Sequence, residues 1–166
     1  GLVFERLGDH QEAKLAFERA TAGSSEPVQA IFYNDPQPDK ILYQGLAWLK
    51  LGRPEQAHQI FQRLKTFGMT HMQDPVSIDY FAVSLPDLLV FDVNLSFRNK
   101  IHCLYLIALG DLGLAMATPS ELEGAFDAVL KLDGNHQGAL VHRSMAAFLE
   151  AVQFQEPIEK KSMETH

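Results

Sequence analysis

A pattern of five residues occurs twice along the chain, 44 positions apart, and it constrains the fold more than any other feature. In both copies a large aromatic residue is followed, at intervals of four, five, four and three residues, by Gly, Ala, Phe and an aliphatic residue. Such internal self-similarity is typical of repeat proteins whose units are pairs of helices. The sequence therefore predicts an all-α fold built from helical hairpins. The two copies are Phe4, Gly8, Ala13, Phe17 and Ala20, and Trp48, Gly52, Ala57, Phe61 and Leu64.

Residues typical of helix ends divide each copy into two helices. Gly8 and Gly52 follow the first helix, and Gly tolerates the left-handed conformation in which helices often end. Pro54 stands in the first turn of the next helix, where its missing N–H costs nothing, and Asp39 is placed to cap the helix before it. The predicted hairpins cover about residues 1–22 and 40–67, with helices over 1–7, 11–21, 40–51 and 54–67.

The rest of the chain predicts a third, degenerate hairpin followed by a capping helix. Asn94 precedes a long segment with helical apolar spacing, and Thr118-Pro119-Ser120-Glu121 has the form of a capping box. Together with the first two hairpins, these elements are expected to form one domain over residues 1–152. The elements are helices over 95–112 and 119–132 (a hairpin over 95–132), an irregular insertion over 68–94, a capping helix over 137–152 and a flexible tail over 153–166.

Composition excludes several classes of protein. With 46% hydrophobic and 21% charged residues, the chain has the composition of a folded domain. A net charge of −7 argues against binding of nucleic acid, and no apolar run approaches the roughly 18 residues of a membrane span. Cys103 is the single cysteine, so no intrachain disulfide is expected, which fits a cytoplasmic protein. The chain starts inside its first predicted helix, and we expect it to be part of a longer protein.

The duplicated pattern resembles the tetratricopeptide repeat. In that family the small Ala allows two helices to approach closely, while the aromatic residues fill the space between units. A unit of that family has about 34 residues, so the longer spacing found here implies an insertion, which we place between Gly23 and Pro38. The resemblance implies a tetratricopeptide-like α-solenoid. Its signature positions are Phe4/Trp48, Gly8/Gly52, Ala13/Ala57 and Phe17/Phe61.

Three further segments resemble the C-terminal repeat region of a family of large, uncharacterised bacterial proteins. Members of that family resemble galactose-mutarotase-like β-sandwich proteins in their N-terminal part. The resemblance implies a carbohydrate-related parent protein, although no residue of this chain by itself indicates sugar chemistry. The segments are Phe32-Tyr33-Asn34-Asp35, Tyr43-Gln44-Gly45-Leu46-Ala47, and residues 79–89.

Candidate catalytic and metal-binding residues have simpler structural explanations. His102 and Cys103 are adjacent, so on a helix they point roughly 100° apart and do not easily share a metal ion. Cys103 lies among aliphatic residues, which favours a buried thiol over a nucleophile. The insertion carries acidic and aromatic residues that could serve a glycosidase, but helix caps and core packing explain them better. We predict no catalytic, metal or cofactor site. The candidate residues of the insertion are Asp79, Tyr80, Phe81, Asp87 and Asp92.

Binding of protein is the expected role. The first helix of each hairpin lines the concave face of a tetratricopeptide stack, and Leu42 and Leu46 stand where chaperone-binding members carry a carboxylate clamp. A leucine-lined groove suits an apolar helix or another part of the same polypeptide. The predicted function is a non-catalytic interaction or scaffolding module; the alternative is a contribution to a carbohydrate-active parent, and self-association through the repeat ends is a third hypothesis. The candidate interaction surface is Leu2, Glu5, Arg6, Leu42, Leu46, Leu49 and Lys50.

Overall fold

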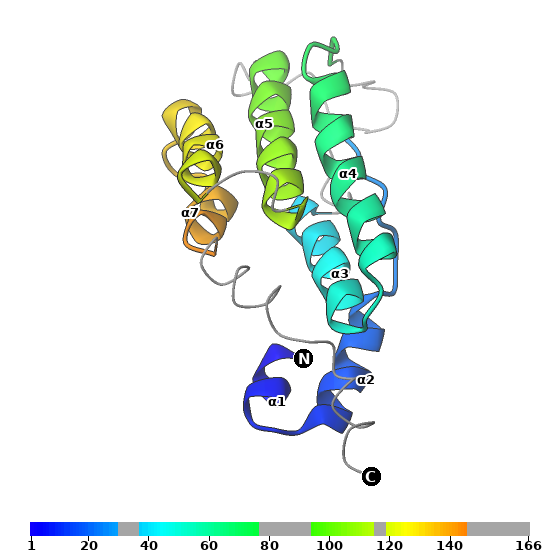
Figure 1. The fold of residues 1–166 in the computed structure, drawn as a ribbon. Helices are drawn as coiled ribbons and strands as arrows, with labels where there is room; N and C mark the ends of the chain where they lie inside the picture. Colours follow the sequence, from blue (N-terminus) through cyan, green and yellow to red (C-terminus); the bar gives the residue numbers. More distant parts are fainter. Residues whose placement is uncertain (30–36, 77–93, 115–118, 146–166) are drawn as a thin grey trace, which may run out of the picture.

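The computed structural model describes residues 1–29, 37–76, 94–114 and 119–145. Every regular element within these ranges is an α-helix, so the all-α prediction is confirmed for this part of the chain. Figure 1 shows how the helices are arranged. They are α1 (Leu2–Arg6), α2 (His10–Ala20), α3 (Pro38–Lys50), α4 (Pro54–His71), α5 (Leu95–Leu114), α6 (Pro119–Leu132) and α7 (Gln137–Arg143).

Helices that follow one another along the chain pack against one another. The pairs α1–α2, α3–α4 and α5–α6 are each in contact, and so are the helices that join one pair to the next, α2 with α3 and α4 with α5. In Figure 1 the helices α3, α4 and α5 lie side by side, and α1 and α2 lie at one end of the molecule. Helix α3 also contacts α5, so it has neighbours on several sides, whereas α1 contacts mainly α2.

The turns inside the first two pairs form as their residues predict. Gly8 and Gly52 both have positive φ, 80° and 71°, which is the left-handed region that glycine tolerates best. The Asp9 carboxylate accepts a hydrogen bond from the amide of Glu12 and caps α2. Pro54 is the first residue of α4, as predicted. Short turns of this kind set the second helix of each pair against the first.

The main core is centred on Phe61, which is 1% exposed. Its ring lies between Gly45 of α3 and Gly113 of α5, and a methyl group at either glycine would overlap the ring. The same arrangement recurs 44 residues earlier, because a methyl group at Gly1 would overlap the ring of Phe17. The repeat therefore extends to a glycine that allows the first helix to approach the aromatic ring of the second.

Three predicted helix ends differ from the structure. Helix α4 continues through Gly68 to His71, because Gly68 packs against the backbone of Cys103 in α5 and does not end the helix. Helix α3 begins at Pro38 after Gln37, so Asp39 lies in the first turn and is not the cap residue. Helix α7 ends at Arg143 within the predicted span 137–152; Ser144 donates its hydroxyl to the carbonyl of Val141, and residues 146–166 lie outside the described ranges.

Candidate functional site

The predicted leucine-lined groove on α3 is not an open surface. Leu42 is fully buried and Leu46 is 6% exposed, and both belong to the main core. The reason is that α3 packs against α4 and α5 as well as α2, so the side that we expected to face a partner is covered. Leu49 is half-buried against the same core. Leu42 and Leu46 are therefore not accessible to a docking partner, and Leu49 is only partly accessible.

The residues predicted in the insertion lie outside the described part of the chain. Asp79, Tyr80, Phe81, Asp87 and Asp92 all fall between residues 77 and 93. The carbohydrate-related alternative rests on these residues, so it stays a prediction.

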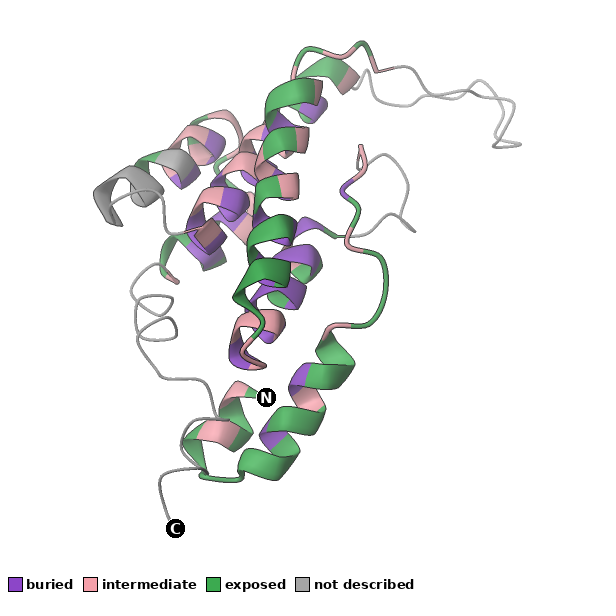
Figure 2. Cartoon of the chain, turned by 45° about the vertical axis from the view of Figure 1, so that its right-hand side comes forward, coloured by how far each residue is buried: buried purple, intermediate pink, exposed green. Residues whose placement is uncertain are grey.

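Helix α1 exposes apolar side chains to solvent. Val3 is 70% exposed, Leu7 is 76% exposed, and α1 has no buried residue. Val3, Arg6 and Leu7 follow the i, i+3, i+4 spacing that places side chains on one side of a helix. We call these three residues the α1 face. Figure 2 shows the contrast, with α1 coloured mostly as exposed and α3 mostly as buried.

The opposite side of α1 is joined to α3 by an ion pair. Lys50 Nζ lies 2.7 Å and 2.9 Å from the two carboxylate oxygens of Glu5. The Lys50 side chain is 6% exposed and that of Glu5 is 17% exposed, so the pair is largely shielded from water. A buried ammonium group needs such a partner, because an unpaired charge in this position is costly. Glu5 and Lys50, both predicted as surface residues, thus hold α1 against α3.

The second cluster that joins these helices is apolar. Ala13 and Phe17 of α2 are buried together with Ala47 of α3, and the half-buried Leu2 and Leu51 pack against them. Leu2 was predicted to line the interaction surface, but it faces this cluster instead. Arg6 remains exposed, as an interaction surface requires.

A cleft of about 300 Å³ lies beside the N-terminal half of α5. Two histidines that line it hold elements of the fold together. His102 Nε2 donates to the carbonyl of Val28 at 2.8 Å, and His136 Nδ1 accepts from the amide of Ala139 and caps α7. Burial lowers the pKa of His136, which keeps this nitrogen able to accept. The polar lining consists of Gln29, Gln37, Arg98, Asn99, His102, Asp133 and His136.

A buried histidine connects α3, α5 and α7. His142 is 1% exposed, and its Nδ1–H donates to the carbonyl of Gly138 at 2.7 Å. Its Nε2 lies 2.9 Å from the hydroxyl of Tyr43, and its Nδ1 lies 2.9 Å from that of Tyr105. Gly138 is required here, because a side chain at this position would overlap the Tyr105 hydroxyl. Sequence analysis missed this cluster, since its members are far apart in the chain.

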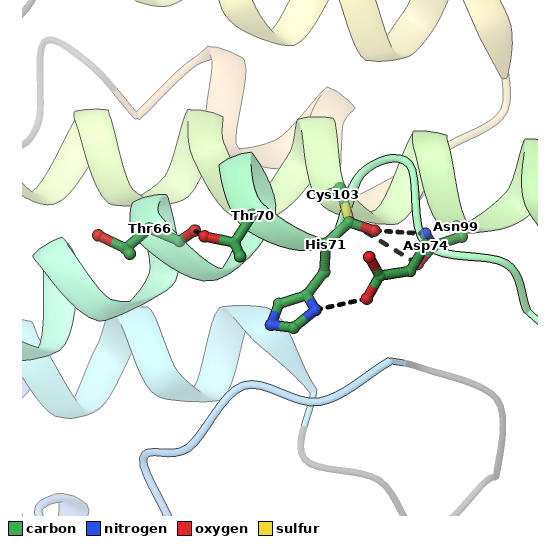
Figure 3. A network of polar contacts seen from close by, with 6 residues as sticks. All are labelled: Thr66, Thr70, His71, Asp74, Asn99 and Cys103. Carbon is green, nitrogen blue, oxygen red and sulfur yellow. Dashed lines mark hydrogen bonds and ion pairs between the residues drawn. The ribbon is translucent and has the colours of Figure 1, made fainter.

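Cys103 is a buried structural thiol, as predicted. Its side chain is fully buried, and burial raises its pKa to about 11, with the nearby charge of Asp74 as a second cause. Asn99 accepts from the thiol at 3.7 Å and donates to the carbonyl of His71 at 2.8 Å, so it joins α5 to the end of α4 (Figure 3). A protonated, enclosed thiol is a poor nucleophile.

The described residues contain neither a cluster of metal ligands nor a helix suited to cross a membrane. No group of three or more metal-ligating side chains lies close enough together to hold an ion in the ranges that the structure describes. Among the helices of the same ranges, none combines the length and the apolar character that a membrane crossing needs.

No protein-family model matches the chain, and no solved structure matches it.

Proposed function

We propose that this chain is a non-catalytic protein-interaction or scaffolding module of the tetratricopeptide type, which packs on another part of the same polypeptide through the α1 face. The observation that carries the proposal is the exposure of Val3 and Leu7 on a helix with no buried residue. Burial of a Val or Leu side chain is worth about 1.5–3 kcal/mol. A helix that leaves two such side chains in water has a strong tendency to associate with another surface.

The described polar groups support a structural role. Cys103 is enclosed and protonated, and His142 is fully occupied between two tyrosine hydroxyls and a carbonyl. Glu5 and Lys50 neutralise each other between α1 and α3. These groups are used to hold helices together, which fits a scaffold.

Photo-crosslinking in the full-length natural polypeptide tests this function. A photoreactive amino acid at position 7 is expected to crosslink to one defined segment, identified by mass spectrometry, because Leu7 lies on the α1 face. The same amino acid at position 69 is the control, since Met69 is similarly exposed, at 62%, but lies on α4. Val3→Asp is expected to suppress the crosslink from position 7 only. Equal labelling from both positions, or no effect of Val3→Asp, would contradict the proposal.

A further inference from the structure

We infer that the cleft beside α5 binds a small zwitterion of about the length of a dipeptide, with the ligand's carboxylate at Arg98 and its ammonium group at Asp133. This inference does not depend on the α1 face and goes beyond the proposed interaction role. The cleft has a volume of about 300 Å³, which is at the lower end of the range for pockets that take up small molecules. It therefore has room for a compound of metabolite size.

Arg98 supplies a positive charge at one end of the cleft. It is an exposed residue in the N-terminal part of α5, and its side chain lines the cleft. None of the ion pairs within the described ranges involves Arg98, and Asp74, which follows α4, is paired with His71. A guanidinium group donates two parallel hydrogen bonds to a carboxylate. This end of the cleft is thus suited to a ligand carboxylate.

Asp133 supplies a negative charge from the turn between α6 and α7. It is half-buried and lines the cleft, and one of its oxygens accepts a hydrogen bond from the amide of Asn135 at 3.0 Å. His136 lines the cleft from the same turn, and burial lowers its pKa. The imidazole is therefore neutral at pH 7 and does not compensate the charge of Asp133. An ammonium group of a ligand would do so.

The two charges enter the cleft from places that are well separated along α5. The ring of His136 lies against that of Tyr105, with 4.5 Å between the ring centroids. Tyr105 follows Arg98 by seven residues, which is about 10 Å along a helix axis. A free α-amino acid carries both charges on one carbon atom, whereas each further residue lengthens a peptide by about 3.3–3.6 Å. With the length of the Arg98 side chain added, a dipeptide spans this distance.

The middle of the cleft is apolar, and its walls are joined to one another. Pro38 of α3 is buried and Ile101 of α5 is half-buried, and both line the cleft. They would contact the alkyl part of a ligand. The hydrogen bond from His102 to the carbonyl of Val28 holds the segment that ends in Gln29 against α5. Walls that are joined in this way lose little entropy when a ligand binds.

The same lining disfavours two other classes of small molecule. A sugar is commonly held against an aromatic ring, and no Phe, Tyr or Trp is among the described residues that line the cleft. A phosphate ester would meet the single cation of Arg98, but it would be repelled by the carboxylate of Asp133. A ligand with one charge of each sign satisfies both ends.

Titration of the full chain with a dipeptide tests the inference. L-alanyl-L-alanine is added to the isotopically labelled protein, and the amide resonances are followed by NMR. We expect a Kd of about 1 mM, with the largest shifts at Arg98, His102 and His136. Free L-alanine, acetate and glucose are the comparison compounds, and each is expected to bind at least about tenfold more weakly.

Analogues that lack one charge test the two ends separately. The C-terminal amide of the dipeptide has no carboxylate, and its N-acetyl form has no ammonium group. Each is expected to bind about tenfold more weakly than the dipeptide, because one charged hydrogen bond is lost. These measurements use the unaltered chain, so they decide the question even where a variant fails to fold.

Substitutions in the cleft connect each charge of the ligand to one side chain. Arg98→Gln is expected to weaken binding of the dipeptide about tenfold and to leave binding of the C-terminal amide unchanged. Asp133→Asn keeps an acceptor for the amide of Asn135; it should weaken the dipeptide to a similar extent and leave the N-acetyl form unchanged. Lys100→Gln is the matched control, because Lys100 is exposed on α5 and does not line the cleft.

Equal affinities for the dipeptide and for acetate or glucose would overturn the inference, and so would the absence of binding at about 20 mM dipeptide. If Arg98→Gln weakened all three peptide ligands equally, Arg98 would act on the shape of the cleft and not on the carboxylate, which would also overturn it. None of these results bears on the crosslink from position 7, which tests the proposed function.

Discussion

The helix pairs α1–α2 and α3–α4 share one sequence pattern but have different surroundings. Phe61 of the second pair lies in the main core between helices on both sides, whereas Phe17 of the first pair lies in a small cluster. Helix α3 buries eight of its residues and α1 buries none. The pattern therefore determines how two helices form a hairpin, and the neighbours on either side determine how much of that hairpin is buried.

The largest predicted effect is on the two equivalent phenylalanines. Phe61→Ala is expected to lower the free energy of unfolding by about 4 kcal/mol, because it leaves a cavity in the centre of the core. Phe17→Ala is expected to cost about 2 kcal/mol, since its cluster is smaller and closer to solvent. Urea denaturation measures both values. Equal losses would mean that the first pair is as well enclosed as the second.

Removal of the ion pair between α1 and α3 should affect the first hairpin alone. Glu5→Gln leaves the buried Lys50 ammonium group without its carboxylate, and we expect a loss of about 2 kcal/mol. Hydrogen exchange should become faster in α1 and α2 and stay unchanged in α3 and α4. Asp127→Asn is the control, because its ion pair with Arg143 is half-exposed and should contribute less than about 1 kcal/mol. An equal increase in the rate of hydrogen exchange in all four helices would contradict the prediction that only the first hairpin is affected.

A smaller effect is predicted where α7 packs beside α3. Tyr43→Phe removes the hydroxyl that contacts His142 Nε2, and a hydrogen bond of this kind contributes about 1 kcal/mol. Thermal unfolding measures the change. The matched comparison is His142→Phe, which should cost more because it also breaks the bond to Gly138. A larger loss of stability for Tyr43→Phe than for His142→Phe would show that the contribution of Tyr43 does not depend on His142.

The smallest predicted effect is the dependence of stability on pH. Burial lowers the pKa of His136 below its ordinary value of 6.5, so the unfolded chain binds a proton more readily than the folded one. Above pH 6.5 His136 is neutral in both states and does not lower the free energy of unfolding. As the pH drops from 6.5 toward the lower pKa of the folded state, the unfolded chain takes up the proton first, so the free energy of unfolding decreases. Protonation also removes the acceptor that caps α7.

Urea denaturation at several pH values between 7.5 and 5 measures this decrease in the free energy of unfolding. We expect it to be about 1 kcal/mol or less. His136→Asn keeps a capping acceptor without the titration, and its profile should be flatter over this interval. An equally steep profile would assign the pH dependence to another group.

The sequence predicts the parts of this fold that depend on local chemistry. Gly8, Gly52 and Pro54 determine the backbone conformation at their own positions. The turns of the first two helix pairs can therefore be predicted from the sequence. Gly68 is different, because it looks like a helix end and serves instead as a close contact with α5. Its role depends on a helix that follows more than 20 residues later in the chain.

The candidate site was predicted less completely for a similar reason. Leu42 and Leu46 are buried because α5 packs near α3, and local periodicity does not show which neighbour a helix will have. The ion pair of Glu5 with Lys50 depends equally on the placement of α1. The sequence did contain information about the apolar face of α1. The 44-residue register aligns Val3 and Leu7 with Ala47 and Leu51, which are covered by α2.

The position of Phe61 between Gly45 and Gly113 has a consequence for how this sequence can change. An alanine at either glycine is excluded while the phenylalanine is present, but a smaller residue at position 61 would make room for it. Three positions on three helices are therefore sterically coupled, and substitutions that are harmful one at a time become compatible in combination. Related chains should vary at these positions together, with glycine retained wherever the aromatic ring is retained.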